Sequence, residues 1–125
     1  MSRNEFLKKY YEIVGCALEY SEKARREGLL ALEEKLDKEK INERDIFEYG
    51  LRFVIDGTDP EIIEKILSNI IKQEKDKDVT LLKNIQKEAV LLIQEGLNPR
   101  LLYFVLNSYV GINLKEDEMH DMVEV

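Results

Sequence analysis

The sequence of 125 residues has few of the side chains on which most catalytic and metal sites depend. It contains one cysteine, one histidine and no tryptophan, so an internal disulfide and a thiolate metal site are excluded. A glycine-rich phosphate loop and a Ser/His/Asp set are also missing from the sequence. The lone histidine, His120, follows Asp117 in an acidic stretch, whereas helical di-metal sites carry repeated Glu and His pairs. We therefore expect no metal, no cofactor and no enzymatic activity.

Long apolar runs and an excess of positive charge are lacking too. The formal net charge is −7, whereas a nucleic-acid-binding protein needs a basic stripe for phosphate contacts. The longest apolar runs, AVLLI and LLYFVL, are far shorter than the roughly 20 residues that cross a bilayer. The first residues, MSRNEFLKK, lack the apolar stretch of a signal peptide. These absences predict a cytoplasmic chain that neither binds nucleic acid nor inserts into a membrane.

Helix-forming residues make up most of what is present. Glu, Lys, Leu and Ile dominate, while the chain has only six glycines and two prolines, a bias that favours helix over strand. Apolar residues recur at helical spacing along most of the chain. We predict an all-α fold, a compact bundle of five or six helices over residues 1–112, followed by an acidic tail over residues 113–125. Cys16, in the apolar run IVGCAL, is expected to fill a small space in the core.

Capping signals place the helix boundaries. The sequence SRNE at the N-terminus predicts a capped first helix that runs to about Arg26. Gly28 either bends this helix or separates it from a second one. Residues 37–44 are charged and predict a loop, with Asn42 as the N-cap of the next helix and Asp45 in its first turn. Three further helices are expected: one that starts at Pro60 and carries an apolar stripe to Ile70, one over residues 79–95, and one that starts at Pro99 and carries apolar residues to Tyr109. Residues 72–78 are either the solvated end of the first of these helices or a short connection.

Both prolines of the chain stand in one repeated frame. DGTDPEIIEKIL begins at Asp56, and EGLNPRLLYFVL begins at Glu95. In each frame, Gly suits the left-handed position that ends a helix, Asp or Asn caps the next helix, and Pro fits its first turn. The sequence therefore predicts two Gly-x-Asx-Pro corners between helices. Capping explains every shared position, and duplication of a helix pair is the alternative explanation.

Three stretches of the chain resemble a known family. KARREGLLALEEKLD carries an Arg followed by a Gly-hydrophobic-hydrophobic-x-Leu-Glu run, and FEYGLRFVIDGTDPEIIEKIL is an apolar helix that ends in DGTDPE. IQEGLNPR supplies a third match, to an Ile-Gln-x-Gly-x-Asn-Pro-Arg-like stretch. Together they resemble the cytoplasmic segments of the motility protein A (MotA) family, the membrane-bound stator subunits of the flagellar motor.

The resemblance implies a partner and two site residues. In that family, a conserved Arg and a conserved Glu of the cytoplasmic segment engage opposite charges on the C-terminal domain of the rotor switch protein FliG. The motif match transfers these roles to Arg25 and Glu33. The two residues are eight positions apart, which would be about 12 Å along an uninterrupted helix. The alternative is that both are ordinary surface charges among local pairs with Glu22, Arg26 and Glu34.

The membrane spans of that family have no counterpart in this chain. Nothing between Leu67 and Ile85 could hold the third and fourth spans, and the pore-side prolines are missing because only Pro60 and Pro99 exist. The resemblance thus implies a rotor-contacting module for torque generation that conducts no ions by itself. It would meet a stator partner subunit only in a full-length membrane form. The chain is either a stator subunit from which the spans were removed or a natural soluble paralogue.

Rotor contact has alternatives in other function classes. The same helices could form an adaptor or regulatory protein for a different partner. Rotor contact requires that Arg25 and Glu33 be exposed on one accessible surface, and burial of either in an internal pair would favour the adaptor. A small carboxylate metalloenzyme would need inward-facing Glu and His side chains, which the apolar pattern does not offer.

Overall fold

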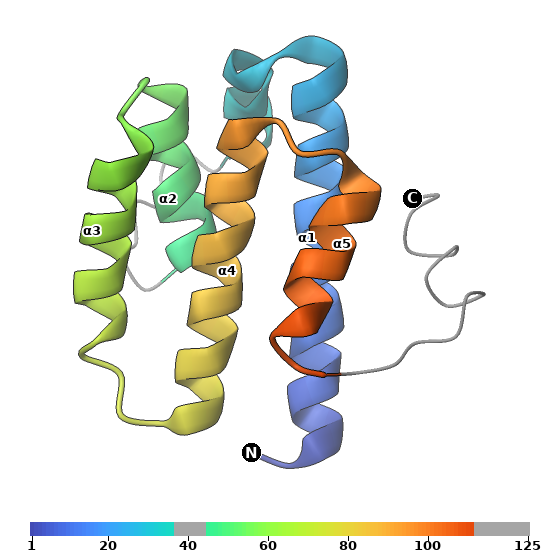
Figure 1. Cartoon of the computed structure of the whole chain (residues 1–125), viewed down its shortest axis with the longest axis vertical. Helices are drawn as coiled ribbons and strands as arrows, with labels where there is room; N and C mark the ends of the chain where they lie inside the picture. The colour runs from blue at the N-terminus through green and yellow to red at the C-terminus, as the bar shows by residue number, and fades with distance from the viewer. Residues whose placement is uncertain (37–44, 112–125) are drawn as a thin grey trace.

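A bundle of helices makes up the part of the chain that the computed structural model describes, residues 1–36 and 45–111 (Figure 1). The predicted all-α fold of five or six helices is confirmed, and no strand occurs within these residues. None of the helices found there is long and apolar enough to cross a membrane. The loop predicted at residues 37–44 and the acidic tail predicted at residues 113–125 lie outside the described residues. The elements are α1 (Arg3–Glu27), η1 (Leu29–Lys35, a 3₁₀ helix), α2 (Ile46–Ile55), α3 (Pro60–Ile71), α4 (Lys77–Glu95) and α5 (Pro99–Ser108).

Helix α4 is the element around which the others pack. It contacts α1, α2, α3 and α5, and Figure 1 shows it between α3 and α5. Because neighbours surround it, its buried surface is wider than a single stripe. Leu92, which the periodicity predicts to face inward, is only partly buried. The residues of α4 that are buried are Leu82, Ile85, Ala89, Val90 and Ile93.

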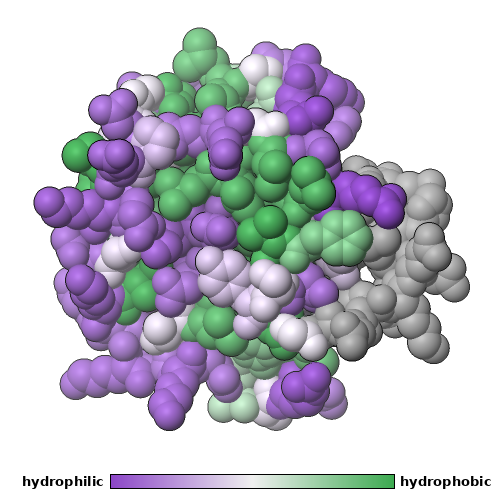
Figure 2. Space-filling model, viewed as in Figure 1, coloured by the Kyte–Doolittle hydropathy of each residue, from purple (hydrophilic) through white to green (hydrophobic). Residues whose placement is uncertain are grey.

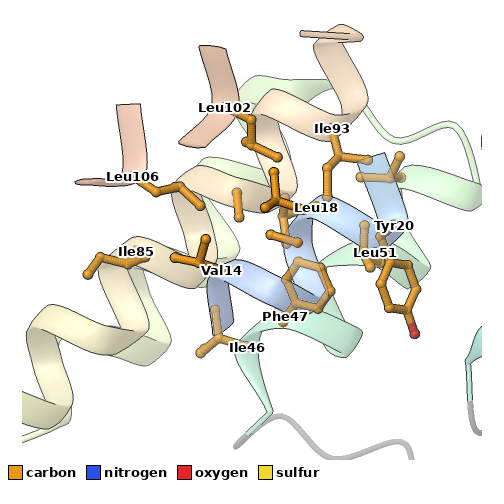
Figure 3. Packing of buried hydrophobic residues seen from close by; sticks show 14 of the residues in the cluster. Val14, Leu18, Tyr20, Ile46, Phe47, Leu51, Ile85, Ile93, Leu102 and Leu106 are labelled. Atoms are coloured by element: carbon orange, nitrogen blue, oxygen red, sulfur yellow. The ribbon is translucent and has the colours of Figure 1, made fainter. Parts of the chain in front are cut away.

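The core brings together residues that are far apart in the sequence. Figure 3 shows Val14 and Leu18 of α1 beside side chains of α2, α4 and α5. Tyr20 and Phe47 meet edge to face with ring centroids 5.1 Å apart, a geometry that stabilises aromatic pairs. Leu32 of η1 is fully buried in the same cluster. The short helix η1 is therefore part of the packed core and not a loose connection.

Two helix starts can be compared with the capping signals. The side chain of Ser2 accepts a hydrogen bond from the backbone N–H of Glu5 at 3.1 Å, which confirms the N-cap predicted for α1. Helix α2 begins at Ile46, and Asp45 is its N-cap, accepting from the N–H of Glu48 at 3.2 Å. The prediction of Asn42 as this cap and Asp45 as a first-turn residue is wrong, because Asp45 itself reaches the free N–H groups of the first turn. Asn42 lies outside the described residues.

Cys16 does not fill the core as predicted. It is exposed, because its neighbours Val14, Ala17 and Leu18 take the buried positions of α1. Its thiol borders a groove that is also lined by Phe47 and Leu82. Partial burial in this groove raises the pKa of the thiol to about 11, and nearby carboxylates add to the effect. The short pattern IVGCAL is apolar on every side, so it could not show which residue would point outward.

Candidate interaction surface at the corner end

The two predicted corners, the C-terminus of α1 and η1 all lie at one end of the bundle (Figure 1). We call this region the corner end, defined as residues 21–36, 56–60 and 94–100. Helices α1, α2 and α4 run toward it and end there, while α3 and α5 start from it (Figure 1). Arg25 and Glu33, the two residues singled out by the motif match, both belong to the corner end.

Each corner has the backbone geometry that its glycine predicts. The φ angles are 79° at Gly57 and 83° at Gly96, in the region that side chains with a Cβ disfavour. At both corners the glycine N–H binds the carbonyl three residues back, and the next N–H binds the carbonyl five residues back, at 3.0 to 3.1 Å. This pair of bonds satisfies carbonyls that the end of a helix would otherwise leave open. Both corner predictions are confirmed.

The two corners differ in how the following helix is capped. The side chain of Asn98 accepts a hydrogen bond from the N–H of Leu101 at 2.9 Å. Asp59 occupies the matching N-cap position of α3, but its side chain makes no such bond. Pro60 and Pro99 both stand in the first turn, as predicted. The first turn of α5 therefore has a capping bond that α3 lacks, which in other proteins typically contributes about 1 kcal/mol.

Arg25 connects α1 to the corner between α4 and α5. It stands in the last turn of α1 and is exposed, yet its Nη1 donates a hydrogen bond to the carbonyl of Gly96 at 2.7 Å. A cation is favourable there because the C-terminus of α4 carries partial negative charge. None of the ion pairs between described residues includes Arg25. A guanidinium has five N–H donors, so the bond to Gly96 leaves others available to a partner.

Two further side chains tie the corners to their neighbours. Ser21, the one polar side chain in the buried set of the described residues, donates from Oγ to the carbonyl of Leu97 at 3.3 Å. Gln94 of α4 donates from Nε2 to the carbonyl of Thr58, in the other corner, at 2.8 Å. Together with Arg25, these bonds join α1 and both corners into one hydrogen-bonded unit. Sequence reasoning missed Ser21 and the link from Gln94, because no local pattern shows which carbonyl a side chain will reach.

Glu33 is exposed on η1. Contacts with α1 hold η1 in place. Lys23 of α1 donates to Glu34 at 3.2 Å and to Glu27 at 3.1 Å. These two carboxylates raise the pKa of Lys23 above its usual value. The hydroxyl of Tyr20 donates to the carbonyl of Lys35 at 3.3 Å, at the far end of η1. Glu33 is thus presented to solvent from a short helix whose C-terminal end is fixed against α1.

The spacing predicted between Arg25 and Glu33 needs correction. Helix α1 ends before Gly28, which has a φ of 93°, and η1 begins after it. The two residues therefore lie on different elements, and the separation of about 12 Å calculated for an uninterrupted helix does not apply. Gly28 separates two helices, which decides between the two alternatives that the sequence left open.

Two of the local pairs suggested by the sequence form between neighbours of Arg25 and Glu33. Arg26 pairs with Glu22 at 3.5 Å, and Glu34 pairs with Lys23 at 3.2 Å. Neither pair includes Arg25. Both Arg25 and Glu33 are exposed at the corner end, as rotor contact requires.

Metal-ligating side chains do not gather at the corner end. In residues 1–36 and 45–111, no group of three or more His, Cys, Asp or Glu side chains is placed to hold a metal ion. Asp117 and His120 lie outside the described residues. The corner end presents exposed charged side chains on a backbone that hydrogen bonds hold in place.

Comparison with known proteins gives a relationship for part of the chain. Motility protein A of Borreliella burgdorferi (strain B31) is 46% identical to the chain over 65 residues. This match covers 52% of the chain but 23% of the relative, so the chain spans well under half of that protein's length. No family model matches the chain, and no solved structure gives a significant match. The resemblance carried by the sequence motifs is confirmed: the chain is related to the motility protein A family.

Proposed function

We propose that the chain is a stator-related module of the flagellar motor that contacts the rotor switch protein FliG through the corner end. The observation that carries this proposal is the exposure of Arg25 and Glu33 at one end of the bundle, on elements held by hydrogen bonds. The relationship to motility protein A supports the choice of partner.

The two charges would act on different points of the partner. Arg25 would meet an acidic group with the N–H donors that Gly96 does not use, and Glu33 would meet a basic group. Exposed charges of this kind speed association more than they tighten binding, which suits a contact that must form and break repeatedly. The bonds from Arg25, Ser21 and Gln94 to corner carbonyls would pass force from the charged surface into the bundle.

The proposal assigns the chain no chemistry of its own. It would act in the cytoplasm as a binding module, without enzymatic activity and without conducting ions by itself. A stator partner subunit would join it only in a full-length membrane form. The adaptor hypothesis differs from this proposal in the partner, and a binding experiment with the rotor protein separates the two.

The test is a titration of the chain with the C-terminal domain of FliG at several salt concentrations. Glu33→Lys and Arg25→Glu should each weaken binding by roughly five- to tenfold, since removing and reversing an exposed pair is worth about 1 kcal/mol or slightly more. Lys65→Glu, a reversal at an exposed site in the middle of α3, is the matched control and should bind as the parent does. Binding should weaken with added salt, because exposed charges are screened over about 8–10 Å. Equal binding by all variants, without salt dependence, would favour the adaptor.

A further inference from the structure

Helix α5 has apolar side chains on its outer face as well as its inner face. Leu102, Tyr103 and Leu106 are buried, and they hold the inner face of α5 against the bundle. On the outer face, Leu101 is 48% exposed and Phe104 is 45% exposed. These two residues are three positions apart, so they are neighbours on the helix surface. A helix that is apolar all round is normally buried on all sides, so the outer face of α5 is suited to a partner.

The apolar surface continues from α5 onto α4. Figure 2 shows apolar residues gathered over α5 and the C-terminal half of α4, on the face of the molecule that Figure 1 presents. Leu91 and Leu92 of α4 are only partly buried and contribute apolar area next to the core. Apolar surface that is contiguous over two elements is typical of an interaction site, whereas scattered exposed leucines are not.

Positive charge borders this apolar surface. Arg100, in the first turn of α5, is exposed, and its guanidinium carbon lies 5.8 Å from the centroid of the Phe104 ring. Within the described part of the chain, the recorded ion pairs include neither Arg100 nor Arg25. Arg25 reaches the same corner through its bond to Gly96. Two guanidinium groups that form no ion pair with a described carboxylate thus stand beside one corner of a chain whose net charge is −7.

These features complement a partner of defined chemistry. Arginine and aromatic side chains carry a large share of the binding energy at protein interfaces. An arginine that is stacked on an aromatic ring is already oriented, so it loses less freedom on binding. The apolar pair needs an apolar ridge, and the two arginines need acidic groups on the flank of that ridge. An amphipathic helix with one acidic flank meets both requirements.

We propose that Leu101 and Phe104, together with Arg100 of the corner end, extend the contact surface along α5, where they bind an acidic-flanked amphipathic helix of the rotor protein. The inference rests on the proposed function, because it takes FliG as the partner. It adds an apolar component to a contact that the family resemblance describes by charge alone. Binding through α5 should therefore be partly insensitive to salt.

The experiment is a titration of the full chain with the C-terminal domain of FliG, using two α5 variants. Leu101→Ser and Arg100→Glu should each weaken binding at least about fivefold, the effect of a residue that matters at an interface. The loss for Arg100→Glu should shrink as salt is added, and the loss for Leu101→Ser should persist. Ile62→Ser is the matched control for Leu101→Ser, because Ile62 is 49% exposed on α3. Lys65→Glu is the control for Arg100→Glu.

Each outcome bears on the inference in a distinct way. If the parent chain does not bind the FliG domain, the proposed function and this inference both fail. If Arg25→Glu and Glu33→Lys weaken binding while both α5 variants bind as the parent does, the proposed function stands and this inference fails. If Ile62→Ser weakens binding as much as Leu101→Ser does, the effect of Leu101→Ser is nonspecific and this inference is overturned. Sedimentation that shows self-association lost in Leu101→Ser, with FliG binding unchanged, would assign the surface to a second copy of the chain and also overturn it.

Discussion

At the scale of single residues, Arg25 shows how one side chain can serve both the fold and a surface. Its guanidinium binds the carbonyl of Gly96 at 2.7 Å while the side chain remains exposed. A charged donor at the C-terminus of a helix is stabilising. A substitution at Arg25 therefore changes both the surface charge and the hold on the corner, and the two effects have to be measured separately.

Arg25→Ala should lower the free energy of unfolding by about 1 kcal/mol, below the range of about 1.5–3 kcal/mol for hydrogen bonds to charged groups because the site is exposed. Arg26→Ala is the matched control. Arg26 also stands in the last turn of α1, but its contact is an exposed pair with Glu22 at 3.5 Å, and such pairs contribute little. Urea denaturation measures both variants. An equal effect of the two substitutions would contradict the role given to the Gly96 carbonyl.

Cys16 should react slowly with iodoacetamide at pH 8 although the residue is exposed. Only the thiolate reacts, and burial of the thiol in its groove raises its pKa to about 11. The fraction of thiolate is therefore small at pH 8 and rises as the pH approaches 11. The alkylation rate, measured against pH on the folded chain, should have its midpoint near 11. A midpoint close to that of a free thiol, about 8.5, would show that the groove does not affect the thiol.

At the scale of elements, the glycines differ in what they allow. A Cβ on Gly50 of α2 would lie 3.0 Å from atoms of Leu67 and Val90, so this glycine lets α2 approach α3 and α4 closely. A Cβ on Gly15 of α1 would meet nothing within 4 Å. The corner glycine Gly96 also has open space around it, and its positive φ of 83° is what a side chain would oppose.

Gly50→Ala should destabilise the chain by about 1–2 kcal/mol, since overpacking a core costs about 1–3 kcal/mol and alanine in a helix recovers part of that. Leu67 and Val90 are both fully buried and have little room to move. Gly15→Ala is the matched helical control and should stabilise the chain by about 0.5–1 kcal/mol. If both variants shift the denaturation midpoint in the same direction relative to the parent chain, the close approach of α2 to α3 and α4 is contradicted.

Gly96→Ala should cost about 1–2 kcal/mol, because a Cβ resists the left-handed conformation. Gly57→Ala should cost a similar amount, since the two corners share their backbone bonds. Chemical denaturation tests both, again with Gly15→Ala as the reference. Unchanged stability in both corner variants would mean that the backbone relaxes at the corners and that the hydrogen-bond pattern there is not needed.

Local features account for the part of the fold that the sequence predicted. Ser2 and the glycines of the two corners act through bonds to residues within five positions of them, so their roles could be recognised from spacing. The links from Arg25 to Gly96 and from Gln94 to Thr58 cross 71 and 36 positions, and they depend on how the helices pack. Cys16 and Asp45 were wrongly assigned because adjacent apolar or polar residues offered equivalent local choices.

At the scale of the whole molecule, the bundle places Arg25, Glu33 and both corners at one end. The motif match identified Arg25 and Glu33 as separate residues of the sequence. The packing of η1 on α1, and of α4 on the other helices, brought them to the same end of the bundle (Figure 1). The α5 surface beside it could not be predicted, since the periodicity of LLYFVL does not show which side of α5 remains uncovered.

The central claim, that the corner end contacts the rotor protein by charge, is tested most directly by a charge exchange at Glu33. Glu33→Lys leaves the carbonyl bond of Arg25 untouched, so its effect is not mixed with a loss of that hold on the corner. The measurement is the affinity of Glu33→Lys for FliG variants in which one basic residue of the C-terminal domain is reversed to acidic. We predict that one such reversal weakens binding to the parent chain and restores binding to Glu33→Lys, with salt reducing both effects. Additive losses for every pair, with no restoration, would contradict rotor contact through Glu33.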